Sequence, residues 1–236
     1  MPYYEKYEER YQTVYAAGGD LWGLSPDDAA LRQLLETWIT ENALTGKTIV
    51  EFACGEGGAG KLLSDLGCRY QGFDLSPSAI ATAQRLLSGC PDAAVQRLDL
   101  VQQQVPGRYD GALDAQGYHM LVCDQDRSAY LRNLSQCLNP GAPVLFYREL
   151  YRDQDSAGPV DSYDQWLALT GSDDSTKVRK FAKKDGQPLE VMIPRMIGRG
   201  RSEAGYREEL AAVGLVLDRF LPEPNSGRAT MFAHKA

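Results

Sequence analysis

The sequence predicts a doubly wound α/β fold, with a mostly parallel sheet covered by helices on both faces. Two observations predict it. Short apolar runs alternate with longer helical patterns between residues 45 and 150, a rhythm typical of parallel strands joined by helices. A glycine-rich turn also joins the first of these runs to the helix that follows it. We expect a single domain over residues 1–236.

Residues 1–44 precede this core and are predicted to be helical. Four tyrosines recur at spacings of three, four and four, which places them on one helical face: Tyr4, Tyr7, Tyr11 and Tyr15. This stripe either packs on the body or forms a lid over a ligand. Ser25-Pro26 then provides a capping residue and a proline at the first helical position, so a second helix is expected to begin there.

The cofactor-binding core is predicted over residues 45–150. Its five expected strands are 48–53, 70–75, 94–98, 109–115 and 143–150. The helices expected between them lie near 61–66, 76–88 and 127–138. The pattern breaks at residues 151–201, an inserted segment that we interpret as a cap. A helix over 203–213 and an antiparallel pair of strands, 215–221 and 229–234, complete the chain within residues 202–236.

Composition excludes several classes of protein. The net charge of −7 argues against a general nucleic-acid binder. No apolar run is long enough for a membrane helix, and the polar N-terminus resembles no targeting peptide. Five cysteines without a CxxC pair, and two distant histidines, favour neither a disulfide framework nor a metal site. We therefore expect a reduced, cytoplasmic protein without a metal, a nucleic acid or a membrane as partner.

The glycine-rich turn carries the strongest functional signal. Gly55, Gly57 and Gly60 satisfy a GxGxxG pattern between a strand and a helix, where backbone N–H groups can approach a ligand. Asp74 ends the next strand, where an acid binds ribose hydroxyls. Two ligands fit this arrangement: a nicotinamide or flavin dinucleotide, and S-adenosylmethionine.

Three features favour S-adenosylmethionine. Glu51 lies just before the glycines, where a carboxylate would crowd a pyrophosphate but could serve a ligand amino group. Asp99 ends the third strand, where a carboxylate can accept a hydrogen bond from an adenine amino group. The terminal pair of strands is unusual in dinucleotide-binding folds.

At these residues the chain resembles the class I S-adenosylmethionine-dependent methyltransferases, which have a Rossmann-like seven-stranded sheet. The matching positions are Glu51, Ala53, Gly55, Gly57, Asp74, Asp99, the strand 109–115 followed by His119, and the turn 138–142. Ala53 stands where the family usually has the first glycine. The resemblance is close over residues 45–150 and looser toward the C-terminus.

The resemblance implies roles for single residues. It places the loop from Gly55 to Gly57 beside the methionine part of the cofactor and Glu51 at its amino group. It places the remaining cofactor-binding residues around the adenosine and the mouth of the site: Asp74, Leu75, Asp99, Leu100 and Asp114. The lid residues expected from similar enzymes are Tyr11, Tyr15 and Trp22.

For residues expected near the methyl acceptor, the sequence leaves alternative roles open. His119 is either structural or a base that accepts a proton from an acceptor hydroxyl or amine. Arg148 and Glu149 end the fifth strand, where they either bind substrate or pair with each other. Glu56, within the glycine turn, is expected to be solvated.

The inserted segment carries an unusual charge. Residues 177–201 hold eight basic and two acidic side chains, a net charge of +6 in an acidic chain. This part is either the solvated face of an accessory helix or a cap that attracts an anionic acceptor.

The predicted function is S-adenosylmethionine-dependent methyl transfer, by SN2 attack of an O or N atom. The acceptor is expected to be a small molecule, as in natural product biosynthesis, or a modified peptide. The alternatives are a nicotinamide-dependent oxidoreductase and a non-catalytic S-adenosylmethionine-binding protein. The sequence is compatible with a monomer or a homodimer.

Overall fold

A computed structural model describes residues 2–155 and 158–236, so residues 1, 156 and 157 lie outside the described residues, the last two within the expected cap. Seven strands form one sheet in the order β3-β2-β1-β4-β5-β9-β8. Their bounds are β1 Thr48–Phe52, β2 Arg69–Asp74, β3 Ala93–Arg97, β4 Gly111–Ala115, β5 Pro143–Leu150, β8 Leu215–Glu223 and β9 Arg228–Lys235. The first five are parallel, whereas β9 runs antiparallel to both β5 and β8. The predicted fold, including the terminal antiparallel pair, is confirmed.

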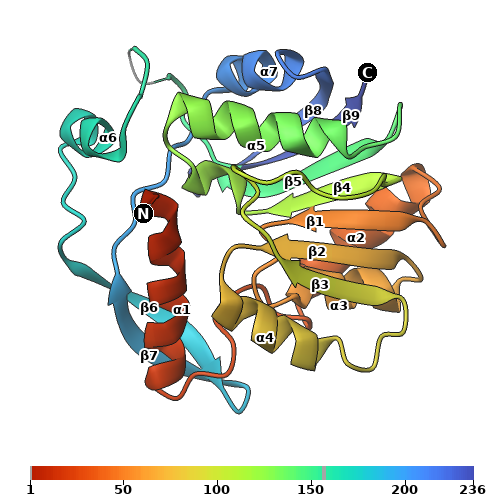
Figure 1. Ribbon diagram of the computed structural model, residues 1–236, viewed down its shortest axis with the longest axis horizontal. Helices are drawn as coiled ribbons and strands as arrows, with labels where there is room; N and C mark the ends of the chain where they lie inside the picture. The colour runs from red at the N-terminus through yellow and green to blue at the C-terminus, as the bar shows by residue number, and fades with distance from the viewer. Residues whose placement is uncertain (1, 156–157) are drawn as a thin grey trace.

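Helices cover both faces of the sheet (Figure 1). Their bounds are α2 Ala29–Glu41, α3 Gly58–Asp65, α4 Pro77–Leu86, α5 Asp124–Gln136 and α7 Glu203–Ala211. Each face of the sheet has its own apolar core, because successive side chains of a strand point to opposite faces. In β1, Ile49 packs with α2 and α3, whereas Val50 packs with α5 and α7. Between the strands and the helices, this alternation encloses apolar side chains on both sides of the sheet.

Local capping determines where these helices begin. Ser76 accepts a hydrogen bond from the backbone of Ala79, and Pro77 occupies the first turn of α4, as predicted. The second helix was expected to begin at Ser25-Pro26, but α2 begins at Ala29. The reason is that the Asp28 side chain, and not that of Ser25, caps the helix.

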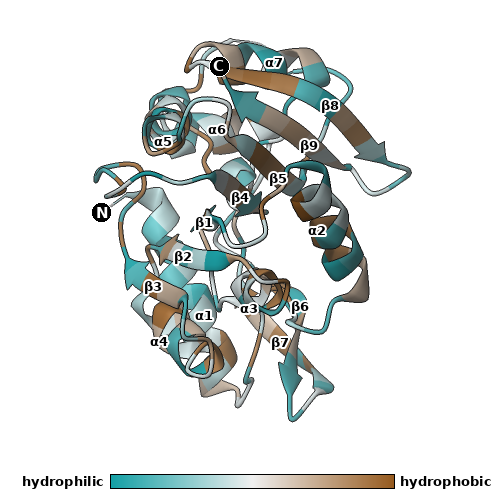
Figure 2. Ribbon diagram, turned by 90° about the vertical axis from the view of Figure 1, so that its right-hand side faces the viewer, coloured by the Kyte–Doolittle hydropathy of each residue, from teal (hydrophilic) through white to brown (hydrophobic). Residues whose placement is uncertain are grey.

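The inserted segment contains α6 (Tyr163–Thr170) and a hairpin of β6 (Lys177–Lys184) with β7 (Gln187–Pro194). Of the two alternatives for the basic part, the accessory helix is wrong, because most of this part forms the β6–β7 hairpin. Asp185 and Gly186, both at positive φ, form the two-residue turn that such hairpins prefer. Figure 2 shows hydrophilic residues at the tip of this hairpin and hydrophobic ones along β5, β8 and β9.

The hairpin packs on the N-terminal helix α1 (Lys6–Ala16), far from it in sequence (Figure 1). Val14 of α1 is buried together with three hairpin residues: Ala182, Val191 and Ile193. Leu21 also pairs with Lys183 through backbone hydrogen bonds. The hairpin and α1 therefore form one layer beside the sheet. No helix of the described part of the chain is long and apolar enough to cross a membrane.

Candidate active site

A cavity of about 360 Å³ lies at the carboxyl ends of the parallel strands, where ligand sites of such sheets form. Turns that follow β1, β2 and β4, and the segment after β3, provide one wall. The residues of this wall are Ala53, Asp74, Leu75, Leu98, Asp99, Leu100, Val101, Ala115, Gln116 and Gly117. The opposite wall comes from α1, the following loop and the hairpin. The volume of the cavity lies in the range of small-molecule sites.

The glycine turn is shaped by left-handed backbone at alternating residues. Ala53, Gly55 and Gly57 have φ of 53°, 52° and 79°. A Cβ atom at residue 55 would lie 2.7 Å from the Tyr11 hydroxyl, so α1 approaches this turn closely. Alanine is tolerated at residue 53 because its methyl group faces Gly117, where an added Cβ would come within 2.5 Å of it. The departure from the family pattern is thus matched by a glycine across the cavity.

Two acids at strand ends line the cavity. Both carboxylate oxygens of Asp74 accept backbone N–H groups at 2.8 Å, one from Gly55 and one from Ser76. Burial raises the pKa of Asp74, and these two hydrogen bonds oppose that shift. Asp99 accepts the backbone N–H of Val101 at 3.0 Å and lies 3.4 Å from the Tyr4 hydroxyl. Asp74 therefore links the glycine turn to the next strand while it faces the cavity.

The N-terminal aromatic residues divide into two groups. Tyr11 and Trp22 line the cavity, with their rings edge to face at 5.0 Å. Tyr15 does not line it, because its hydroxyl donates to Glu56 at 2.8 Å. Glu56 is 2% exposed and also accepts the backbone N–H groups of Trp22 and Gly23. The expectation that Glu56 is solvated is wrong: it holds the lid segment against the glycine turn.

Two other carboxyl groups lie in the interior and do not line the cavity. Glu51 accepts a hydrogen bond from the Tyr70 hydroxyl, and burial raises its pKa to about 8. Asp114, expected at the mouth, is fully buried and accepts the backbone N–H of Gly117 at 2.7 Å and the Tyr130 hydroxyl at 2.6 Å. Asp114 therefore shapes the mouth indirectly, since Gly117 and Tyr130 are cavity residues.

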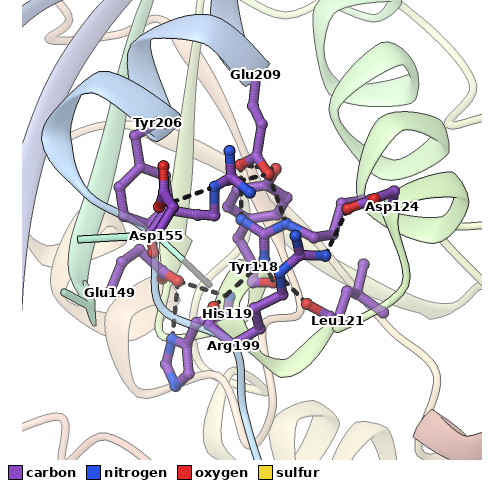
Figure 3. Close-up of polar contacts among 12 residues, drawn as sticks. Tyr118, His119, Leu121, Asp124, Glu149, Asp155, Arg199, Tyr206 and Glu209 are labelled. Atoms are coloured by element: carbon purple, nitrogen blue, oxygen red, sulfur yellow. Dashed lines mark hydrogen bonds and ion pairs between the residues drawn. The ribbon is translucent and has the colours of Figure 1, made fainter. Parts of the chain in front are cut away.

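His119 is 1% exposed and is not part of the cavity wall. Its Nδ1 lies 2.8 Å from Glu149, and its Nε2 lies 3.2 Å from an Arg228 guanidinium nitrogen, which can only donate (Figure 3 shows the Glu149 contact). These partners assign a neutral ring with its proton on Nδ1. Burial, aided by Arg228, lowers the pKa of His119 to about 3. The ring is therefore placed to hold Arg228 and not to accept a proton from a substrate.

The other two residues predicted near the acceptor do not pair with each other. Arg148 forms an ion pair with Glu223 at 3.0 Å, whereas Glu149 is fully buried beside His119. Burial raises the pKa of Glu149 to about 7. Neither residue is part of the cavity wall. Both residues instead contact cavity residues indirectly or through the backbone. The Arg148 carbonyl accepts a hydrogen bond from Arg228, and Glu149 contacts His119, which contacts Arg228.

The sequence interpretation missed three cations that line the cavity: Arg10, Lys180 and Arg228. Two of them had a local signal. Arg10 interrupts the tyrosine stripe within α1, and Lys180 interrupts the apolar alternation of β6. Arg228 follows the loop between the last two strands and is brought to the cavity only by the antiparallel pairing of β9 with β5.

Comparisons with known proteins agree with this geometry. Residues 50–144 match a family model described as a methyltransferase domain. An uncharacterized methyltransferase from Geobacillus kaustophilus is 26% identical over 153 residues, which cover 64% of this chain and 62% of that protein. Both matches indicate that the central part of the chain, residues 50–144, resembles methyltransferases in sequence.

Solved structures show the same fold over nearly the whole chain. An S-adenosylmethionine-dependent methyltransferase from Clostridium acetobutylicum has a TM-score of 0.66 at 15% identity, with 99% of each chain covered. An amino pentose methyltransferase of calicheamicin biosynthesis from Micromonospora echinaspora has a TM-score of 0.63 at 14% identity, with 96% of each covered. The likeness in fold therefore extends beyond residues 50–144, the segment that the family model matches.

The residues that line the cavity fit S-adenosylmethionine. A cofactor with an adenosine end needs hydroxyl acceptors and apolar walls, and Asp74, Leu75, Asp99 and Leu100 provide both at one end of the cavity. A cationic sulfonium centre is favoured by aromatic rings, which Tyr11 and Trp22 offer. Within the glycine turn, Ala53 lines the cavity, whereas Gly55 and Gly57 do not, and Gly55 lies against Tyr11 of α1.

Proposed function

We propose that this protein is an S-adenosylmethionine-dependent methyltransferase that methylates an O or N atom of a small molecule. The observation that carries the proposal is a single cavity lined by Ala53 of the glycine turn, two strand-end acids and an aromatic lid. The structural neighbour from calicheamicin biosynthesis supports a small acceptor, since that enzyme is an amino pentose methyltransferase.

Each wall of the cavity has a distinct part in this function. Asp74 would accept hydrogen bonds from the ribose hydroxyls, and Asp99 would accept one from the adenine amino group. Leu75 and Leu100 would pack against the adenine ring. When bound, S-adenosylmethionine supplies a methyl group already activated on a sulfonium. Tyr11 and Trp22 would close over it and exclude water.

The chain's contribution to the reaction is mainly positional. Among the residues described, the cavity wall includes no histidine, and His119 lies outside it with Nε2 already engaged by Arg228. When the acceptor atom is held in line with the methyl group, the entropy cost of bringing the two reactants together is met on binding. This positioning alone accelerates the transfer step greatly, without a base. An acceptor amine or hydroxyl would then lose its proton to solvent after transfer.

An acceptor panel tests the proposal. Purified protein is incubated with S-adenosylmethionine and small amines, phenols and hydroxy acids, and release of S-adenosylhomocysteine is measured. We expect turnover with at least one O or N nucleophile and methylation of that atom by mass spectrometry. Tight binding of S-adenosylhomocysteine without turnover on any acceptor would instead indicate a non-catalytic binding protein.

A further inference from the structure

Three cations converge on the cavity from three separate elements. Arg10 comes from α1, Lys180 from β6 and Arg228 from the first residue of β9. Within residues 2–155 and 158–236, none of the three forms an ion pair with a carboxylate. Other buried arginines are neutralised: Arg127 pairs with Glu209 at 2.7 Å, and Arg199 pairs with Asp124 (Figure 3 shows the second pair). Among the buried arginines of the described residues, Arg10 therefore differs from Arg127 and Arg199 in lacking a carboxylate partner.

Arg10 is the most deeply placed of the three. It is 5% exposed, and its guanidinium lies over the rings of Tyr7 and Trp22, at 5.1 and 4.7 Å from their centroids. Its Nε is buried without a hydrogen-bond partner in the described part of the chain. Aromatic faces stabilise a guanidinium only in part, so a buried cation with a free donor is costly unless a ligand completes it.

Lys180 lies on the inner face of the hairpin. Residues of β6 alternate in direction, and Ala182, two positions on, is buried against α1. Val191, which pairs with Lys180 across the hairpin, is buried in the same cluster as Ala182. Phe181, by contrast, points outward and is 66% exposed. Lys180 therefore lies on the face of β6 that meets α1, and its side chain, although exposed, forms part of the cavity wall.

Arg228 is fixed by two neutral acceptors. Its Nη1 donates to the backbone carbonyl of Arg148 at 2.9 Å and to Nε2 of His119 at 3.2 Å. These contacts orient the guanidinium. Among the described residues no carboxylate lies at ion-pair distance from it, and Glu149 and Glu223 raise its pKa only from farther away. The buried Glu149, in turn, orients the His119 ring. His119 is thus a positioning residue for a cavity cation.

The three cations also lie near enough to affect one another. Burial lowers the pKa of Lys180, and repulsion from Arg10 and Arg228 lowers it further. Like charges held together without a counter-ion destabilise the ligand-free protein, and a bound anion would relieve this. The cofactor of the proposed function carries one carboxylate, which can match one cation, so at least two cations remain for another ligand.

We propose that Arg10, Lys180 and Arg228 form a subsite for the anionic group, a carboxylate or a phosphate, of a small-molecule acceptor. This inference rests on the proposed function and narrows its substrate class to acids or phosphate esters that also carry a nucleophilic O or N atom. Bidentate guanidinium groups suit both anions. The basic segment of the sequence thereby contributes one specific side chain to the site.

The test is a calorimetric titration at low ionic strength, first with S-adenosylhomocysteine and then with an anion. Inorganic phosphate and benzoate are titrated separately into protein saturated with S-adenosylhomocysteine. We expect saturable binding of at least one anion by the wild type, at least tenfold weaker in Lys180→Met and in Arg228→Met. Lys177→Met removes a charge from the exposed end of the same strand and should leave binding unchanged.

The outcomes separate the subsite from the function. Preference for phosphate or for benzoate identifies which anion the acceptor carries. Absence of anion binding by the wild type overturns the subsite even if S-adenosylhomocysteine binds. If the variants lose S-adenosylhomocysteine as strongly as the anion, the cations serve the cofactor carboxylate and the subsite is also overturned. Failure of the wild type to bind S-adenosylhomocysteine contradicts the proposed function itself.

Discussion

Glu56→Ala should open the lid and weaken cofactor binding. Glu56 accepts hydrogen bonds from Tyr15 and from the backbone of Trp22 and Gly23, and the last two residues line the cavity. Each buried donor left unpaired costs about 1–3 kcal/mol. Water can reach the exposed Gly23, so we count a net cost of about 2 kcal/mol to the closed lid. At 1.4 kcal/mol per factor of ten, the dissociation constant of S-adenosylhomocysteine should rise roughly 30-fold.

Calorimetry measures this change, with two variants as controls. Glu56→Gln keeps one acceptor oxygen for the lid backbone, so its affinity for S-adenosylhomocysteine should fall less than fivefold (about 1 kcal/mol). Glu36→Ala removes a carboxylate of α2 that is 50% exposed and should have no effect. Circular dichroism verifies that each variant is folded. An affinity of folded Glu56→Ala within twofold of the wild type would refute the role assigned to Glu56.

Three further variants test other parts of the site. Asp74→Ala leaves the backbone N–H groups of Gly55 and Ser76 unpaired, so S-adenosylhomocysteine should bind at least tenfold more weakly by calorimetry, and unchanged affinity would contradict the proposed contact. Gly58→Ala places a methyl group against the carbonyl of Leu24 and should lower the unfolding free energy by about 1–3 kcal/mol in urea, whereas a neutral effect would show that this helix start is not closely packed. Glu51 stays protonated in the folded state up to a pKa of about 8 but ionises near its ordinary pKa of 4.5 when unfolded, so its contribution destabilises the fold as pH rises between these values. In Glu51→Gln, where Tyr70 keeps its acceptor, the fall in unfolding free energy from pH 5.5 to 7.5 should be smaller by about 2 kcal/mol, and an identical fall in both proteins would contradict this.

The sheet could be predicted because its signals are local. Each strand is a short apolar run, and the connection rule for such runs fixes a parallel arrangement. The same rule brings strand-end residues to one edge, and for this reason Asp74 and Asp99 could be found from sequence and do line the cavity. The glycine turn was recognisable because left-handed backbone at Gly55 and Gly57 favours glycine.

Other features depend on contacts between distant residues. The basic run 177–184 is a strand only because it pairs with 187–194 and packs on α1, which is more than 150 residues away in sequence. Glu56 is charged and lies in a turn, so only the lid that folds over it shows that it is buried. The role of His119 depends in the same way on Arg228 from the last strand.

Titration with S-adenosylhomocysteine and, separately, with NADH tests the central claim most directly. The account predicts saturable calorimetric binding of one S-adenosylhomocysteine per chain and no heat of binding with NADH, because the cavity joins Asp74, Asp99 and the aromatic lid around a single nucleoside. Binding of NADH without any response to S-adenosylhomocysteine would contradict it and favour an oxidoreductase.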